Sequence, residues 1–121
     1  MDCKIVYYNI SIESENMTRW VIDYWENDQG NSPVEKWLDK LTKDQLKSVS
    51  KFIEMLEEAG TDLKMPHSFP LGEGLFELRE HRYGYRIYYC FQGNRLIILL
   101  ASGDKKSQTR DISTARRRLR D

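Results

Sequence analysis

The chain has 121 residues, of which 40% are hydrophobic and 31% are charged, and its 19 Lys and Arg balance its 19 Asp and Glu. These values predict one folded domain with a modest core and exclude a disordered chain. No apolar run approaches the roughly 18 residues that cross a bilayer. The N-terminus also lacks the apolar region and cleavage site of a secretory signal. We therefore expect a cytoplasmic protein without membrane contact.

Charge and cysteine placement add two expectations. Residues 1–60 hold 7 basic and 12 acidic side chains, and residues 61–121 hold 12 basic and 7 acidic ones. The basic half can face a polyanion, although small domains also show such segregation by chance. Cys3 and Cys90 have neither metal-binding nor redox spacing, so we expect reduced thiols, with Cys90 buried on a strand. No cofactor or metal is indicated.

The N-terminal part divides into an extension and the start of a domain. Residues 4–9 could form a short strand before a polar loop, so 1–18 is interpreted as an added strand or arm and 19–121 as a single domain. Residues 19–26 are a better strand candidate, because Val21 and Asp23 alternate with Ile22 and Tyr24.

Two consecutive helices are predicted next. Ser32 can be an N-cap, with Glu35 completing a capping box. Thr42 and Gln45 repeat that box, and the following apolar residues recur at helical spacing until Gly60 supplies the stop. We expect helices over residues 32–41 and 42–60, folded as a hairpin on a sheet.

The rest of the chain predicts a meander and a last helix. Residues 61–74 contain two prolines and two glycines and are expected to form a loop. The last meander strand has no alternation, which favours burial on both faces. A final helix carries a narrow apolar stripe of Ile112, Ala115 and Leu119. The expected ranges are strands at 75–81, 85–91 and 95–102 and a helix at about 107–120.

Cations and aromatic rings alternate between residues 74 and 111. Cations pair with phosphates and rings stack on unpaired bases, so this pattern predicts a surface for single-stranded nucleic acid. The cations are Arg79, Arg82, Arg86, Lys105, Lys106 and Arg110, and the rings are Tyr83, Tyr85, Tyr88 and Tyr89.

Three motifs follow the two predicted helices: GLFELR, GYRIYY and GDKKSQTRDISTA (103–115). Together with the order of elements, they resemble the RelE/ParE toxin superfamily. The last motif is similar to the G-D-K-x-x-Q-x-x-D-I-x-x-A pattern of the HigB-like, phage-derived "addiction module killer protein" branch. The resemblance covers about residues 20–118. It implies an α+β, RelE-like fold, with an N-terminal helical hairpin packed on a mainly antiparallel twisted sheet and a C-terminal helix.

The resemblance also implies a function. Members are toxins of type II toxin–antitoxin pairs, held inactive by a cognate antitoxin that in this branch is usually a helix-turn-helix protein. Most studied members cleave messenger RNA, usually on the ribosome and without metal. ParE-type members instead inhibit DNA gyrase, and some members keep only antitoxin binding. An endoribonuclease is the leading hypothesis, and the other two stay open.

RNA cleavage without a metal ion requires a base, a cation and an acid. A base takes the proton of the 2′-hydroxyl, a cation stabilises the phosphorane, and an acid protonates the 5′-oxygen, leaving 2′,3′-cyclic phosphate and 5′-hydroxyl ends. The resemblance assigns Arg79 and Arg86 to this site, with added charge from Lys105 and Lys106. Because Arg86 and the second residue after it share a strand face, we place Tyr88 in the site and its neighbour Tyr89 in the core.

Five further residues are candidates for RNA binding: Arg82, Tyr85, His81, Gln108 and Arg110. His81 is expected on the face of Arg79, although a solvated strand end explains it equally well. His67 is a weaker candidate without a motif match. The arginines at 116–118 are expected to form a solvated helix face.

Overall fold

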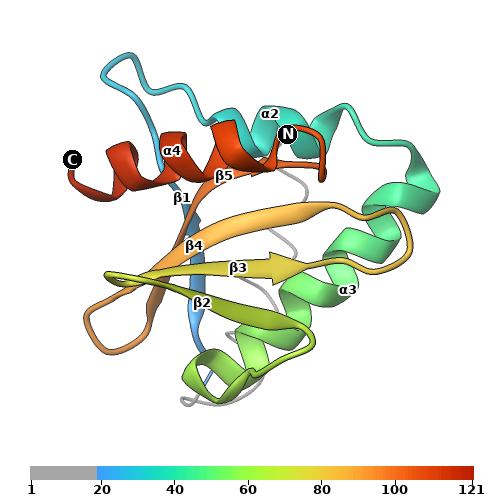
Figure 1. Cartoon of the computed structure of the whole chain (residues 1–121), viewed down its shortest axis with the longest axis horizontal. Helices are drawn as coiled ribbons and strands as arrows, with labels where there is room; N and C mark the ends of the chain where they lie inside the picture. The colour runs from blue at the N-terminus through green and yellow to red at the C-terminus, as the bar shows by residue number, and fades with distance from the viewer. Residues whose placement is uncertain (1–18) are drawn as a thin grey trace.

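The computed structural model describes residues 19–121 (Figure 1). The strand expected at 4–9 and the loop after it lie outside these residues. The described elements are β1 (Val21–Tyr24), α2 (Pro33–Asp39), α3 (Lys43–Ala59), a 3-10 turn (Gly60–Asp62), β2 (Ser68–Gly72), β3 (Leu75–Arg79), β4 (Arg86–Gln92), β5 (Leu96–Gly103) and α4 (Gln108–Leu119).

The five strands form one mixed sheet in the order β1-β5-β4-β3-β2. Strands β2 to β5 are antiparallel neighbours, and β1 adds to β5 in parallel. The α+β class, the mainly antiparallel sheet and the C-terminal helix are therefore confirmed. No helix within residues 19–121 is both long and apolar enough to span a membrane.

Two apolar clusters lie on opposite faces of this sheet. The first packs α2 and α3 on the sheet, and the second packs α4 on the other face. Strand β5 supplies Ile97 and Leu99 to the first and Leu100 and Ala101 to the second, which confirms that it is buried on both sides. Cys90 is buried in the second cluster, as expected.

The capping boxes of the two helices differ. At α3, Thr42 Oγ1 accepts from the backbone N–H of Gln45 at 3.2 Å, and Gln45 Oε1 accepts from the Thr42 N–H at 2.9 Å. At α2, the side chain of Ser32 makes no capping hydrogen bond, so the box predicted with Glu35 is wrong. The backbone explains the difference, because ψ is 98° at Ser32 and 167° at Thr42.

Strand β2 corrects the prediction of a continuous loop over 61–74. Its Pro70 lies opposite Phe76, and a register shift follows before Gly72. Proline lacks an N–H but is tolerated on an edge strand, and β2 is the edge of the sheet. The sequence did not predict this strand, because proline and glycine, which it contains at Pro70 and Gly72, are typical of loops. Its presence places Phe69 beside β3.

Candidate active site

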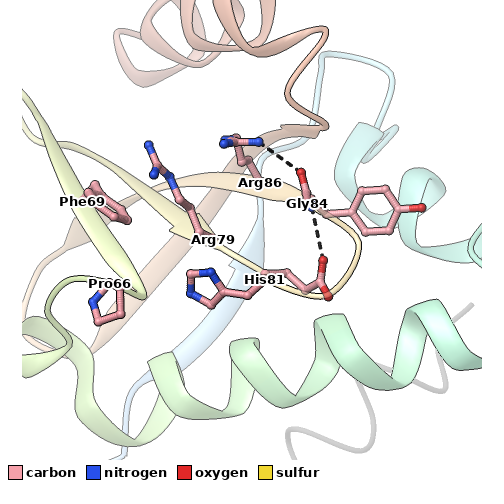
Figure 2. Close-up of a pocket in the computed structure, with 8 residues that line it drawn as sticks. Pro66, Phe69, Arg79, His81, Gly84 and Arg86 are labelled. Atoms are coloured by element: carbon pink, nitrogen blue, oxygen red, sulfur yellow. Dashed lines mark hydrogen bonds between the residues drawn. The ribbon is translucent and has the colours of Figure 1, made fainter.

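Two arginines from neighbouring strands form the centre of the site. Arg79 at the end of β3 lies opposite Arg86 at the start of β4. Both line a hollow of about 300 Å³, which we call the arginine hollow, and Figure 2 shows both guanidinium groups on the same side of the sheet. The other lining residues are Pro66, Phe69, Glu80, His81, Gly84 and Tyr85. The register of a tight antiparallel pair thus brings two permanent positive charges together.

A fully buried carboxylate, Glu77, holds this pair in place. Its Oε1 accepts from Arg79 Nε at 2.7 Å, and its Oε2 accepts from Gln108 Nε2 at 2.8 Å. Arg86 Nε lies 3.6 Å from Oε2, which is an ion pair but too long for a hydrogen bond. The carboxylate therefore ties β3 to the first residue of α4 and offsets part of the charge of the two arginines.

The side chains of the two arginines differ in how much of their surface is exposed to solvent. Arg79 is 34% exposed, and its guanidinium lies 3.9 Å from the centre of the Phe69 ring. Arg86 is 12% exposed and donates from Nη1 to the carbonyl of Gly84 at 3.1 Å, while its Nε has no hydrogen-bond partner among the described residues. Arg86 is therefore fixed between the Gly84 carbonyl and the Glu77 carboxylate while its side chain lines the hollow.

The structure corrects the prediction that Tyr88 is exposed. Tyr88 shares the face of Arg86, as expected, but α4 covers it and it is fully buried in the second cluster. Burial, and then the nearby Glu77 carboxylate, raise the pKa of its phenol well above the ordinary value. Tyr89 is also buried, on the opposite face, as predicted. Alternation identified the faces, but it could not show that both are covered.

His81 lies beyond the end of β3, in a turn, and not on the strand as expected. The turn is built by the buried Glu80 carboxylate, which accepts from the backbone N–H groups of Arg82, Tyr83 and Tyr85 at 2.9 to 3.2 Å. His81 Nε2 and His67 Nδ1 are 3.3 Å apart. Both histidines are therefore neighbours of the site, and His81 also lines the arginine hollow.

Two of the remaining RNA-binding candidates, Arg82 and Tyr85, come from this turn and the residues directly after it. Tyr85 lines the hollow and packs edge-on against Trp37, with 5.2 Å between ring centres. Burial is the main cause of its raised pKa. Arg82 is exposed and points away from the hollow, toward a groove beside α3.

The GDKKSQTRDISTA motif mainly builds the connection from β5 to α4. Asp104 Oδ1 accepts from the N–H of Ser107 at 3.1 Å, and this hydrogen bond lowers the pKa of Asp104. Ser107 Oγ in turn donates to Asp111 at 2.5 Å. A Cβ at Gly103 would lie 2.0 Å from the Asp111 carboxylate, so only glycine fits without a shift. Ala115 is fully buried against the sheet.

The three other cations of this region are exposed. Lys105 and Lys106 lie in the turn before α4, and Arg110 lies on the first turn of that helix. None of them lines the arginine hollow. They can therefore add positive charge around the start of α4, but the structure does not bring them into contact with Arg79 or Arg86.

The arginines at 116–118 are not simply a solvated face, as had been expected. Arg116 donates to the carbonyl of Leu71 at 2.7 Å, and Arg118 donates to that of Leu100 at 2.7 Å. Arg118 also lies over the ring of Trp25, 4.5 Å from its centre. Only Arg117 of the three is fully exposed. Two of the arginines therefore attach α4 to the sheet.

Sequence reasoning missed Glu77 and Glu80. Glu77 precedes Arg79 by two residues, so the strand period alone puts both on one face. That spacing was a usable signal for an ion pair. Nothing in the sequence marks Glu80 as the organiser of this turn, because its partners are three backbone N–H groups and the hydroxyl of Ser48 on α3, which donates to it at 2.6 Å. Within residues 19–121 no group of three or more His, Cys, Asp or Glu side chains is placed to hold a metal ion.

Comparison with known proteins supports one family. The family model described as "Phage derived protein Gp49-like" matches residues 36–120. The M. tuberculosis protein named "Putative toxin HigB3" is 36% identical over 76 residues, which are 60% of this chain and 67% of that protein. An uncharacterized H. influenzae protein is 45% identical over 47 residues, 38% of this chain, and the match spans about half (48%) of that protein.

Solved structures share the fold. A free-state arginine-to-alanine double mutant of the E. coli toxin RelE has a TM-score of 0.62 at 14% identity, covering 84% of this chain and 98% of its own. The RelE of a RelE–RelB complex from Pyrococcus horikoshii has a TM-score of 0.51 at 21% identity, covering 74% and 97%. The fold is therefore that of the RelE-type toxins. The chain belongs to the phage-derived Gp49-like family, within the RelE/HigB-type toxins.

Proposed function

We propose that this protein is the toxin of a type II toxin–antitoxin pair and that it cleaves messenger RNA in the arginine hollow without a metal ion. One observation supports this most: Arg79 and Arg86 face the same hollow and are held by the buried carboxylate of Glu77. Guanidinium groups donate pairs of hydrogen bonds to phosphate oxygens, and their permanent positive charge can stabilise the additional negative charge of a phosphorane. Family membership supports the toxin role.

In this proposal the arginines bind the scissile phosphate and stabilise charge. The 2′-oxygen attacks phosphorus, its proton passes to a base, the bond from phosphorus to the 5′-oxygen breaks, and an acid protonates that oxygen. The guanidinium groups of Arg79 and Arg86 would approach the phosphate from two neighbouring strands, and that of Arg79 is the more exposed. The products are a 2′,3′-cyclic phosphate and a 5′-hydroxyl.

His81 is our candidate for one of the two proton transfers. The carboxylates of Glu77 and Glu80 are already occupied by arginine, amide and backbone donors. His81 lines the same hollow and has a ring nitrogen engaged by His67. Histidine titrates near neutral pH and can act as acid or base. Its position beside the two arginines supports this assignment.

The partners follow from the same proposal. A helix-turn-helix antitoxin would hold the toxin inactive, and the ribosome would present the messenger RNA. The archaeal RelE whose fold is similar was solved together with RelB, which supports an antitoxin-type partner here. The exposed Lys105, Lys106 and Arg110 can contact phosphates at the start of α4.

Primer extension on messenger RNA from cells that express the chain alone tests this function. Wild-type protein should create new internal 5′ ends, and Arg86→Ala should remove them because one of the two guanidinium groups that line the hollow is lost. With purified components the rate should fall by about 10²- to 10³-fold. Arg117→Ala, which removes an exposed arginine outside the hollow, is the matched control and should cleave normally.

Two results would contradict the nuclease. Growth arrest with intact transcripts and DNA-damage signalling would support a ParE-like gyrase inhibitor. No arrest and no cleavage would support a remnant that only binds its antitoxin. Unchanged cleavage by the Arg86 variant would remove that residue from the mechanism.

A further inference from the structure

A second depression lies beside α3, next to the arginine hollow. We call it the α3 groove, and its volume of about 590 Å³ exceeds that of the hollow. It is lined by Asp44, Lys47, Ser48, Lys51, Phe52, Met55, His67 and Arg82. These residues come from the outer side of α3, the segment before β2 and the turn after β3. Of these residues, the proposed cleavage uses only His67, through its contact with His81, and Arg82 is the RNA-binding candidate among them.

The rim of the groove is positively charged. Lys47 and Lys51 lie one helical turn apart and are both exposed, and Arg82 faces them from the turn. Asp44 is the acidic lining residue, so three cations oppose one carboxylate. None of the ion pairs formed between residues 19–121 involves these three cations. A chain of zero net charge thus has a local cationic surface at this place.

The floor of the groove is apolar and aromatic. Phe52 is half-buried, and its ring centre lies 5.6 Å from that of His67 and 5.4 Å from that of His81. Met55 continues the apolar floor along α3. Cations around an aromatic floor suit a single-stranded nucleotide, whose phosphates pair with lysines and whose base stacks on a ring.

The groove and the arginine hollow meet at the two histidines. His81 lines the hollow and His67 lines the groove, and their ring nitrogens are 3.3 Å apart. Phe52 packs against both rings. The two depressions therefore adjoin at the histidines, and a strand whose phosphate sits between Arg79 and Arg86 would enter the groove by passing His81.

We propose that the α3 groove binds the single-stranded RNA next to the scissile phosphate. Lys47 and Lys51 pair with its phosphates, and one base lies against Phe52 and His67. This inference rests on the proposed function, since it extends the RNA path from the arginine hollow. It assigns substrate binding to α3, a helix whose other side packs in the core.

The test is the salt dependence of RNA binding by the purified full chain. The probe is a short fluorescent oligoribonucleotide of mixed sequence with 2′-O-methyl riboses, which cannot be cleaved. For single strands, each phosphate contact contributes about 0.7 to the slope of log affinity against log salt. The double variant Lys47→Gln, Lys51→Gln should therefore bind more weakly, with a slope smaller by about 1.4. Ultraviolet cross-linking should attach the probe near Phe52 or His67.

The controls separate this inference from the proposed function. Lys36→Gln with Lys64→Gln removes two exposed lysines outside the groove and should leave affinity and slope unchanged. Arg79→Ala with Arg86→Ala tests the hollow. If only this arginine variant loses binding, RNA occupies the hollow and the groove proposal is wrong. If wild-type protein does not bind the probe and does not cleave transcripts in cells, the proposed function fails as well. A groove variant that binds RNA normally but loses its protein antitoxin would make the groove a protein-docking surface.

Discussion

At the scale of single residues, Glu77 places a negative charge beneath the two arginines that define the site. A buried carboxylate is costly unless its partners compensate for lost water. Here Arg79 and Gln108 donate to it directly, and Arg86 lies within ion-pair distance. The same carboxylate limits how strongly the arginines attract other anions. Glu77 is therefore a positioning residue whose charge sets both stability and phosphate affinity.

Replacing Glu77 by Gln should lower the free energy of unfolding by about 1–3 kcal/mol, because charge-assisted hydrogen bonds are lost in a buried place. Urea denaturation followed by circular dichroism measures this change. Glu73→Gln is the matched control, since Glu73 is 88% exposed and its 3.7 Å ion pair with Arg116 is expected to contribute less than about 1 kcal/mol. Equal effects of the two substitutions would mean that Glu77 does not anchor the arginines.

At the scale of elements, the two helices show how a sequence motif and a formed cap can differ. Both Ser32 and Thr42 are followed three residues later by a suitable partner. Only the box of Thr42 forms, with both of its reciprocal hydrogen bonds. Helix α2 is instead held by tertiary packing, with Val34 and Leu38 buried in the first cluster.

Thr42→Ala should destabilise the protein by about 1 kcal/mol, which is the usual cost of losing a cap hydrogen bond. Ser32→Ala should destabilise the protein less than Thr42→Ala does, since no cap hydrogen bond is lost. Parallel denaturation curves of the two variants check the contrast. A larger effect at Ser32 would show that its hydroxyl has a role that the cap geometry does not reveal.

In the connection between β5 and α4, the residues of the family motif mainly have structural roles. Gly103 leaves room for the carboxylate of Asp111. Hydrogen bonds of Asp104 and Ser107 hold the turn, and the buried Ala115 packs the helix against the sheet. Gln108 then reaches Glu77 under the arginines. The motif is thus explained largely by the placement of α4, and through Gln108 it also supports the site.

At the scale of the whole molecule, the start of the domain is joined to α3 by a buried acid. Trp20 donates its backbone N–H to the carbonyl of Glu57 at 3.0 Å, and Arg19 Nη1 lies 3.2 Å from Glu57 Oε1. Burial raises the pKa of the Glu57 carboxyl from 4.5 to about 7, and the Arg19 guanidinium partly opposes that rise. The contact links β1 to the helix that covers the sheet.

This pKa shift predicts a pH dependence of stability. The folded protein binds the Glu57 proton more tightly than the unfolded chain, so the contribution is fully present below about pH 4.5. It is lost as the pH rises through about 7. Glu57→Gln should therefore flatten the fall in Tm over this window relative to wild type. Glu73→Gln removes an exposed carboxylate that is not among the charges acting on Glu57, and it should keep the wild-type profile. Identical profiles for all three proteins would argue against a raised pKa.

Local patterns in the amino-acid sequence were sufficient to predict most secondary-structure elements and the family resemblance. Periodicity identified β1, both helices of the hairpin, β3 to β5 and α4, because alternation and helical spacing are local consequences of backbone geometry. The motifs indicated the RelE/HigB type, which the family model supports. Local signals failed for β2, since Pro70 and Gly72 suggest a loop wherever no sheet edge is known.

Which of the candidate residues contact one another depends on the tertiary structure. In the folded protein Tyr88 is buried under α4, and Arg79 lies opposite Arg86 beside Glu77. The ring nitrogens of His81 and His67 lie within 3.3 Å of each other. Lys105 and Lys106 lie outside the hollow. These outcomes depend on strand register and on how helices cover the two faces of the sheet. Such contacts join residues far apart in the chain, so no local pattern encodes them.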